Sequence, residues 1–139
     1  MKKGFTLIEI MIVVLILGLL AGLVMPNLIG QTDKAKQKLV CIQMKMLGDS
    51  LKSFKMQYGH YPSTMEGLKA LIKNPNSEEY SDYPQDGFLD ANSVPKDTWN
   101  HPYIYINNDE QFDIISLGAD NKEGGNGINK DIKYSQCQN

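Results

Sequence analysis

The sequence predicts an α+β fold in which one long amino-terminal helix packs on a small antiparallel β-sheet. Three observations lead to this prediction. Residues 5–25 form an almost uninterrupted apolar run. Residues 33–58 repeat apolar side chains mostly every three or four positions, which is typical of an amphipathic helix. Residues 104–106 and 112–117 have the length and composition of two short strands, and residues 107–110 between them form a turn.

The apolar run is long enough to cross a membrane. At 1.5 Å per residue, about 20 helical residues span a hydrocarbon core of roughly 30 Å. A cleaved secretory signal has a shorter apolar core and a cleavage site of small residues after it, which this sequence lacks. Lys2 and Lys3 place the amino terminus on the cytoplasmic side. We therefore expect a single-pass membrane helix that is retained, with the rest of the chain exported from the cytoplasm.

Glu9 lies inside this apolar run. An ionised side chain in the middle of a bilayer costs roughly 2.5 to 3.5 kcal/mol on insertion scales, so such residues are rare and generally functional. A buried charge is tolerated when it is paired. The sequence therefore indicates that Glu9 has a cationic partner.

The amphipathic segment is predicted to continue the first helix as far as Tyr58 and to end at Gly59. Its apolar positions are expected to bury against a globular head: Leu39, Ile42, Met46, Leu47, Leu51, Phe54 and Tyr58. Its lysines are expected to form a solvated face: Lys34, Lys36, Lys38, Lys45, Lys52 and Lys55. The net charge is only −2 and no aromatic residues alternate with these lysines, so no nucleic-acid partner is expected.

The region after the helix contains short elements. Residues 63–66 match a capping box, which predicts a short helix to about Lys73. Residues 74–92 are rich in Pro, Ser, Asp and Tyr and are predicted to form a loop. The predicted strand pair follows.

The segment from Gly4 to Glu9, Gly-Phe-Thr-Leu-Ile-Glu, resembles the class III signal of the type IV pilin and pseudopilin superfamily. This resemblance implies a pilin-like fold and a prepilin peptidase that cuts between Gly4 and Phe5 and methylates Phe5. It also implies that Glu9 meets the Phe5 amine of a neighbouring subunit during assembly, and that Pro26 lets the helix extend. The implied organisation is a leader at 1–4, a transmembrane assembly helix at 5–30 and a periplasmic head at 31–139.

Two further segments resemble the major pseudopilins of type II secretion systems, the protein G family. They are residues 61–68, with Tyr-Pro-Ser followed by Glu-Gly-Leu, and residues 94–103, with Pro, Asp, Trp and Pro-Tyr. Thr98 and Asn100 depart from the family pattern, which usually has Pro and Gly there; both remain compatible with a turn.

Residues 117–132, the glycine-rich loop, combine carboxylates, amides and glycines, the oxygen-rich mixture that Ca²⁺ prefers. An EF-hand is excluded because Lys122 and Gly124 occupy positions that need oxygen ligands. The loop instead resembles the calcium loop of major pseudopilins. That resemblance implies a calcium site made of the Leu117 carbonyl, Asp120 and Asp131, with Asn126 or Asn129 in addition. The alternative is a solvated turn that holds no metal.

Cys41 and Cys137 are the only cysteines. An exported domain lies in an oxidising compartment, so a disulfide between them is expected, against the alternative of two free thiols. Such a bridge contributes about 4 kcal/mol in the chain-entropy model. Major pseudopilins generally lack this pair, whereas type IV pilins often carry a disulfide in their distal half, so the cysteines leave open which filament the chain builds.

Catalysis has little support. His60 and His101 lie in turn segments, and no nucleophile motif is present. The resemblance implies a structural subunit of the type II secretion pseudopilus, which polymerises from the inner membrane and helps to export folded proteins. Its implied partners are its own copies, minor pseudopilins, prepilin peptidase, the inner-membrane assembly platform with its ATPase, and membrane lipid before assembly. The alternatives are a type IV pilin for adhesion, motility or DNA uptake and, more remotely, a membrane-anchored metal-dependent hydrolase.

Overall fold

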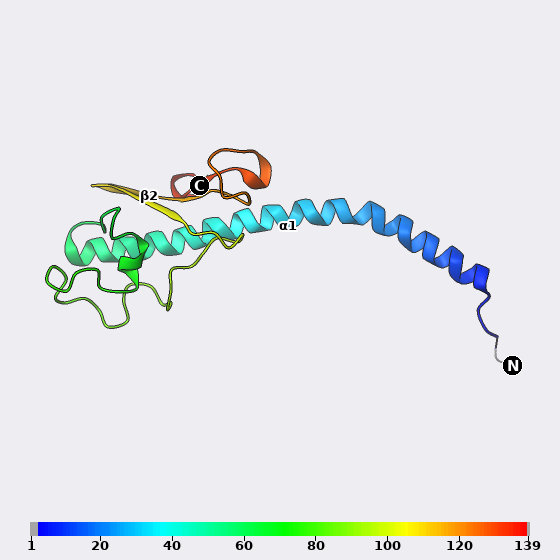
Figure 1. The fold of residues 1–139 in the computed structure, drawn as a ribbon, viewed down its shortest axis with the longest axis horizontal. Coiled ribbons are helices and arrows are strands. Elements are labelled where there is room, and N and C mark those ends of the chain that lie inside the picture. The colour runs from blue at the N-terminus through cyan, green and yellow to red at the C-terminus, as the bar shows by residue number, and fades with distance from the viewer. Residues whose placement is uncertain (1–2, 139) are drawn as a thin grey trace. The chain divides into compact units, whose positions relative to one another are not determined.

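The computed structural model of the chain contains one long helix, a small sheet and several short 3₁₀ helices (Figure 1). It describes residues 3–138, and the side chains of residues 24–30 are outside the described set. The chain divides into two compact units, Met1–Ala35 and Lys36–Asn139, here called the amino-terminal unit and the head.

Helix α1 spans Leu7–Tyr58 and belongs to both units. Its end is confirmed: the Gly59 amide donates to the Lys55 carbonyl at 2.7 Å, and the chain then turns away. The helix is assigned through Pro26, whose side chain is among those that are not described. The predicted role of Pro26 in extending the subunit therefore lies outside the described residues.

The sheet has the order β1-β2-β3, with both pairs antiparallel. Strand β1 spans Ile104–Asn108, and β2 spans Gln111–Ser116. These two were predicted, although the turn between them is tighter than expected, because pairing extends to Asn108 and Gln111. Strand β3, Ile132–Lys133, was missed. Two residues carry no detectable alternation of apolar and polar side chains.

The core of the head lies between α1, the sheet and the segment after α1. Its buried apolar residues come from α1, the segment after α1, the sheet and the carboxyl terminus. In α1 they are Val40, Met44, Leu47, Leu51 and Phe54. The others are Leu68, Ala70, Leu71, Tyr80 and Leu89 after the helix, Tyr103 just before β1, Tyr105 in β1, Ile114 in β2, and Cys137. The tyrosines place their hydroxyls on polar partners at the edge of this core. Tyr105, for example, donates to the Pro62 carbonyl at 2.7 Å.

The predicted apolar stripe on α1 is partly wrong. Leu47, Leu51 and Phe54 are buried, but Leu39, Ile42 and Met46 are 51%, 54% and 49% exposed. Val40 and Met44 take the inward positions instead. The helix carries two neighbouring rows of apolar side chains, and a period of three or four residues fits either row. The packing of the head selects the row that begins with Val40.

The predicted helix after residue 63 is also corrected. The capping box itself forms, because the Ser63 amide donates to Glu66 at 2.7 Å and the Glu66 amide donates to the Ser63 hydroxyl at 3.1 Å. It closes only a turn, since Gly67 has φ 63° and ψ −165° and takes the chain out of the helical direction. A short 3₁₀ helix, η1, follows at Leu68–Leu71.

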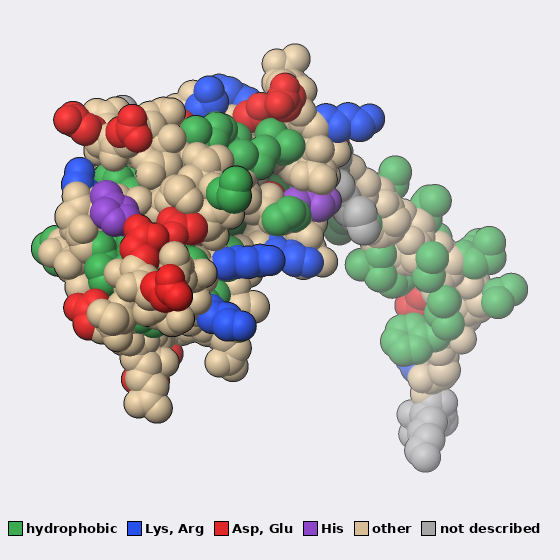
Figure 2. All heavy atoms as spheres, turned by 60° about the vertical axis from the view of Figure 1, so that its left-hand side comes forward, with side chains coloured by type: hydrophobic (Ala, Val, Ile, Leu, Met, Phe, Trp, Pro, Cys, Tyr) green, Lys and Arg blue, Asp and Glu red, His purple; other side chains and the backbone are tan. Residues whose placement is uncertain are grey.

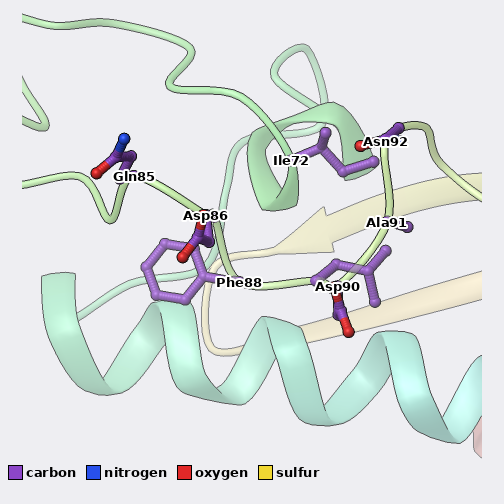
Figure 3. Close-up of a pocket in the computed structure, with 9 residues that line it drawn as sticks. Ile72, Gln85, Asp86, Phe88, Asp90, Ala91 and Asn92 are labelled. Atoms are coloured by element: carbon purple, nitrogen blue, oxygen red, sulfur yellow. The ribbon is translucent and has the colours of Figure 1, made fainter.

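Residues 74–92 form a loop, as predicted, and aromatic contacts hold it against the end of α1. Phe88 points onto α1 (Figure 3), where its ring centroid lies 5.1 Å from that of Phe54. The Tyr80 ring lies 5.3 Å from Phe54 and 4.7 Å from Tyr58. The loop is therefore anchored by side chains rather than by regular backbone pairing.

Candidate functional site

The amino-terminal motif forms a helix cap. The Glu9 amide donates to the Thr6 hydroxyl at 3.3 Å, and the Thr6 amide donates to Glu9 Oε2 at 3.4 Å. This reciprocal pair is a capping box, which the Thr-x-x-Glu spacing signals in the sequence and which the sequence analysis did not consider. Glu9 thus has a role within one subunit: it helps to start α1 at Leu7.

Phe5 and Gly4, the residues on either side of the predicted cleavage site, precede the helix. Phe5 is 79% exposed, and a Cβ added to Gly4 would meet nothing within 4 Å. Both residues are therefore exposed. Glu9, four residues after Phe5, is also exposed.

The apolar side chains of the amino-terminal unit are exposed around the whole helix. From Leu7 to Leu23, every leucine, isoleucine, valine and methionine is at least half exposed, and apolar side chains cover the face of this unit seen in Figure 2. Among residues 3–23 and 31–138, whose side chains are described, no helical stretch meets the length and hydropathy needed to cross a membrane.

The glycine-rich loop leaves β2 and returns to β3 next to its starting point. The Ala119 amide donates to the Ile128 carbonyl at 2.9 Å. At Gly118, which has φ 73°, an added Cβ would lie 2.8 Å from that same carbonyl oxygen, so the two limbs approach too closely for any side chain there. The loop is therefore closed at its base by backbone contacts.

Asp131 points into this loop. Its Oδ2 accepts a hydrogen bond from the Gly124 amide at 3.0 Å, whereas its Oδ1 is buried and has no hydrogen-bond partner among the described residues. A buried carboxylate oxygen without a donor is costly unless a cation or water satisfies it. This orphaned oxygen fits the predicted ligand role of Asp131.

The structure gives weaker support for the other predicted ligands. Asp120 is exposed, and its Oδ1 accepts from the Lys122 amide at 3.1 Å. Asn126 precedes the 3₁₀ helix η2, Gly127–Asn129, which has no side-chain cap, and Leu117 directly follows β2. Within the described residues, no three His, Cys, Asp or Glu side chains gather in a metal-binding group. The predicted set has only two carboxylates and relies on backbone and amide oxygens for the rest.

Cys41 and Cys137 form a disulfide in the structure, with their Cα atoms 5.3 Å apart. Cys137 ends the 3₁₀ helix η3, Tyr134–Cys137, which follows β3 directly. The bridge therefore ties the end of the chain to α1.

Asp97 is an organising residue that the sequence analysis did not single out. It is 5% exposed, and its Oδ1 accepts from the amides of Trp99 and His101 at 3.0 and 2.9 Å. Its Oδ2 accepts from the buried Ser116 hydroxyl at 2.8 Å. The signal was present as an Asp opening a turn, the position from which its side chain bonds amides further along.

The two departures from the family pattern lie in this same turn. Asn100 has φ 64°, a conformation that glycine adopts freely and that asparagine tolerates better than most residues. The Thr98 hydroxyl donates to the Lys36 carbonyl of α1 at 3.3 Å, a bond that proline lacks the group to make. In this chain the turn therefore gains an additional link to the helix.

Tyr103 links the start of β1 to α1 by donating its hydroxyl to the Gln43 side chain. Burial, together with the nearby charge of Asp97, raises the pKa of Tyr103 well above its ordinary value of 10.0. The phenol therefore remains a hydrogen-bond donor throughout the neutral range.

A separate pocket of about 640 Å³ lies between Ile72 and residues 85–92 (Figure 3). Asp86 and Asp90 are among its lining residues. It contains none of the residues predicted for processing, assembly or metal binding, so it is not part of those sites.

Comparison with known proteins first defines the class. Residues 1–25 match the prokaryotic N-terminal methylation motif. A long helix that begins within this motif and packs in the head against a small antiparallel sheet defines a pilin-like subunit. Residues 27–135 match type II secretion system (T2SS), protein G. The chain belongs to the type II secretion system protein G family.

Named relatives agree with this assignment. The chain is 40% identical to the type II secretion system core protein G of Vibrio cholerae, over 94% of this chain and 90% of the relative. It is 42% identical to that of Pseudomonas aeruginosa, over 94% and 93%. The fold is similar to the crystal structure of the major pseudopilin from the type 2 secretion system of enterohaemorrhagic Escherichia coli, with a TM-score of 0.63, 32% identity and coverage of 78% and 93%.

These findings confirm the predicted family and pseudopilin fold, and they favour a secretion pseudopilin over a surface pilin. Relatives of this kind are structural components, so the prediction that the chain is not an enzyme is also confirmed. Membership of the family implies processing by prepilin peptidase and assembly into a membrane-anchored periplasmic pseudopilus.

Proposed function

We propose that this chain is synthesised as a precursor, cleaved between Gly4 and Phe5, methylated on Phe5 and polymerised from the inner membrane into a periplasmic filament that helps to export folded proteins. One observation carries this proposal. The methylation motif begins a helix whose apolar side chains are exposed on every face. Such a surface needs lipid before assembly and other subunits afterwards.

Within this proposal, the amino-terminal unit is a single-pass membrane segment and the head lies in the periplasm. The lysines at 2 and 3 support this orientation. The buried core and the disulfide of the head support a domain that remains folded outside the cytoplasm. The further partners are minor pseudopilins and an inner-membrane platform driven by a cytoplasmic ATPase.

Glu9 is the proposed assembly residue. Cleavage after Gly4 creates an ammonium group on Phe5, four residues before Glu9 in the sequence. The cap uses Oε2 of Glu9 and the amide of Thr6, both of which survive cleavage. The carboxylate can therefore cap its own helix and also accept the Phe5 ammonium of a neighbouring subunit in a filament core with little water.

Pro26 is proposed to loosen the helix during assembly. Proline lacks the amide hydrogen for one helical hydrogen bond and its ring crowds the preceding turn. Gly22 and Gly30 flank it in the sequence and have low helix propensity. The segment therefore needs less energy to extend than the rest of α1.

The glycine-rich loop is proposed to bind Ca²⁺ through the Leu117 carbonyl, Asp120 and Asp131, with Asn126 or Asn129 as a further ligand. The buried, unpartnered Oδ1 of Asp131 supports this proposal. When bound, the cation neutralises carboxylate charge and stabilises the folded loop. The Asp131 bond to Gly124 holds the carboxylate inside the loop beforehand.

A complementation experiment tests the function. The gene is deleted in its native strain, and wild type, Glu9→Gln and Glu79→Gln are each restored. Glu79→Gln is a matched control at an exposed position of the head. We expect wild type and the control to return secreted proteins to the medium, and Glu9→Gln to accumulate in the membrane without restoring them.

Normal secretion with Glu9→Gln would contradict the assembly role. Loss of surface filaments with unchanged secretion in the deletion strain would instead make the chain a type IV pilin. Catalytic turnover that persists with Glu9→Gln, and is lost only when Asp120 and Asp131 are changed, would support the hydrolase.

A further inference from the structure

Residues 131–137, here called the carboxyl-terminal arm, connect the proposed cation ligand Asp131 to the disulfide. The arm consists of Asp131, strand β3 and the 3₁₀ helix η3, which ends at Cys137. Only five residues lie between Asp131 and the bridged Cys137. The position of Asp131 therefore depends on how firmly this arm is held.

The first attachment of the arm is its pairing with β2. It comprises only two residue pairs, Ile115 with Lys133 and Ser116 with Ile132. A strand of two residues at the edge of a sheet is too short to be stable by itself. Other contacts must therefore hold the arm in place.

The second attachment is the ring of Tyr134, which lies against Gly48 of α1. A Cβ added at Gly48 would lie 2.7 Å from the Tyr134 hydroxyl oxygen, so only glycine leaves room for the ring. The ring also contacts Phe112 of β2, with centroids 4.9 Å apart. Glycine is unfavourable inside a helix, and its position at this contact accounts for its presence in α1.

The third attachment is the disulfide from Cys137 to Cys41, and it is the only covalent one. A fourth contact acts on the loop itself: Gln37 Nε2 donates to the Gly127 carbonyl at 2.8 Å. Gln37, Cys41 and Gly48 follow one another at spacings of four and seven on α1, so they lie on one face of the helix. This face holds both the loop and the arm.

We propose that the Cys41–Cys137 disulfide is a positioning element for cation binding: it fixes the carboxyl-terminal arm on α1 and so keeps Asp131 in the glycine-rich loop, with Gln37 holding the same returning limb at Gly127. This inference rests on the calcium binding proposed above. A ligand held in its bound arrangement before the cation arrives loses less conformational freedom on binding, which increases affinity. By linkage, bound Ca²⁺ stabilises the attached arm to the same extent.

The test measures calcium affinity and calcium-dependent stability of the full chain in detergent micelles. Calcium chloride is titrated by calorimetry, and melting temperatures are recorded in calcium and in chelator. The variants are Cys41→Ser/Cys137→Ser, Gln37→Met and Asp131→Asn. Gln31→Met is the matched control, because Gln31 is an exposed glutamine earlier in the same helix. Circular dichroism verifies that each variant retains its helix.

We expect the double serine variant to bind Ca²⁺ about tenfold or more weakly, because the arm is no longer pre-positioned. Gln37→Met, which removes one exposed hydrogen bond and keeps the disulfide, should weaken binding by about threefold to fivefold. Asp131→Asn should lose most of the affinity. Gln31→Met should bind as wild type does.

The comparison of melting temperatures separates positioning from simple stabilisation. Positioning predicts that the rise in melting temperature caused by calcium is smaller in the cysteine and Gln37 variants than in wild type. The proposal would be overturned if the melting temperatures of the cysteine and Gln37 variants fell equally in calcium and in chelator while their calcium affinity was unchanged. If wild type binds no more calcium than Asp131→Asn does, the calcium site itself is refuted. The wild-type titration alone is enough to detect that outcome.

Discussion

The two units of the chain use the same kinds of apolar side chain in opposite ways. Leu15 in the amino-terminal unit is 65% exposed, whereas Leu51 in the head is fully buried. Both belong to helix α1. Helix formation alone therefore does not determine which part of the apolar surface is buried within the same chain. The head buries its own apolar surface, whereas the amino-terminal unit leaves its apolar surface exposed.

The largest test of this difference makes the same substitution in both units. Leu51→Ala should lower the free energy of unfolding of the head by roughly 3 to 5 kcal/mol, because it leaves a cavity in a closed core. Leu15→Ala should change it by less than about 0.5 kcal/mol, as expected at an exposed site. Urea unfolding followed by the fluorescence of Trp99, the single tryptophan, measures the head specifically.

Equal effects of the two leucine substitutions would mean that the units fold as one, contrary to the comparison. Secretion in the native strain adds a second readout. A filament-core role predicts that Leu15→Ala reduces secretion while leaving the urea midpoint of the head unchanged.

A smaller effect is expected at Asp97, which concerns polar rather than apolar groups of the head. Asp97→Ala should destabilise the head by about 2 to 3 kcal/mol, because two part-buried backbone amides and the buried Ser116 hydroxyl lose their acceptor. Asp97→Asn retains one oxygen for the amides and a group that can donate to Ser116. It should therefore recover part of the loss in the same urea assay.

Glu9→Gln is the matched polar substitution in the amino-terminal unit. Its effect should be on secretion and not on the unfolding of the head, since the Glu9 side chain bonds the amide of Thr6 at the start of α1. An altered urea midpoint in Glu9→Gln would show that the two units are coupled in stability.

The smallest expected effect is a loss of stability in alkali that belongs to the head. Burial raises the pKa of Tyr103, and likewise of Tyr105 and Tyr80, above the ordinary 10.0. The folded head keeps these protons at pH values where the unfolded chain has lost them. Stability is therefore complete below about pH 10 and falls as the pH rises further.

Melting temperatures between pH 8 and 11 check this expectation. Tyr103→Phe should lower the melting temperature at neutral pH, because its bond to Gln43 is lost. It should also make the decline above pH 10 shallower. A decline that is unchanged in Tyr103→Phe would assign the alkaline effect to other groups.

Much of the architecture was predictable from the sequence because its signals are long. The apolar run and the amphipathic repeat define a single helix over 52 residues, and its end at Gly59 follows from helix-stop chemistry. The hairpin of β1 and β2 was predictable from the length and composition of its two segments. Strand β3 was not, because its stability comes from the disulfide and the Tyr134 contact rather than from local pattern.

Two capping boxes show the limit of what a local sequence motif can predict. Thr6–Glu9 begins a helix that continues for many turns, and Ser63–Glu66 makes the same reciprocal bonds but closes only a turn. The difference is Gly67, whose positive φ redirects the chain. Which conformation that glycine takes is decided by the surrounding head, so the four-residue motif cannot predict it.

The candidate sites were predictable in their residues and less so in their environment. The sequence suggested Asp131 as a ligand, but the burial of its Oδ1 and its bond to Gly124 depend on the folded loop. The burial of Asp97 depends on Ser116, which lies 19 residues further along the chain. Contacts between such distant residues leave no periodic signal in one sequence.

The bridge between Cys41 and Cys137 also determines how the head responds to proteases. It encloses residues 42–136, which include the exposed glycine-rich loop and the loop at 74–92. A single cut in either loop leaves the two fragments covalently joined, and the larger part of the core contacts can persist. A subunit that has been nicked once therefore still carries both halves of its head on the same helix α1.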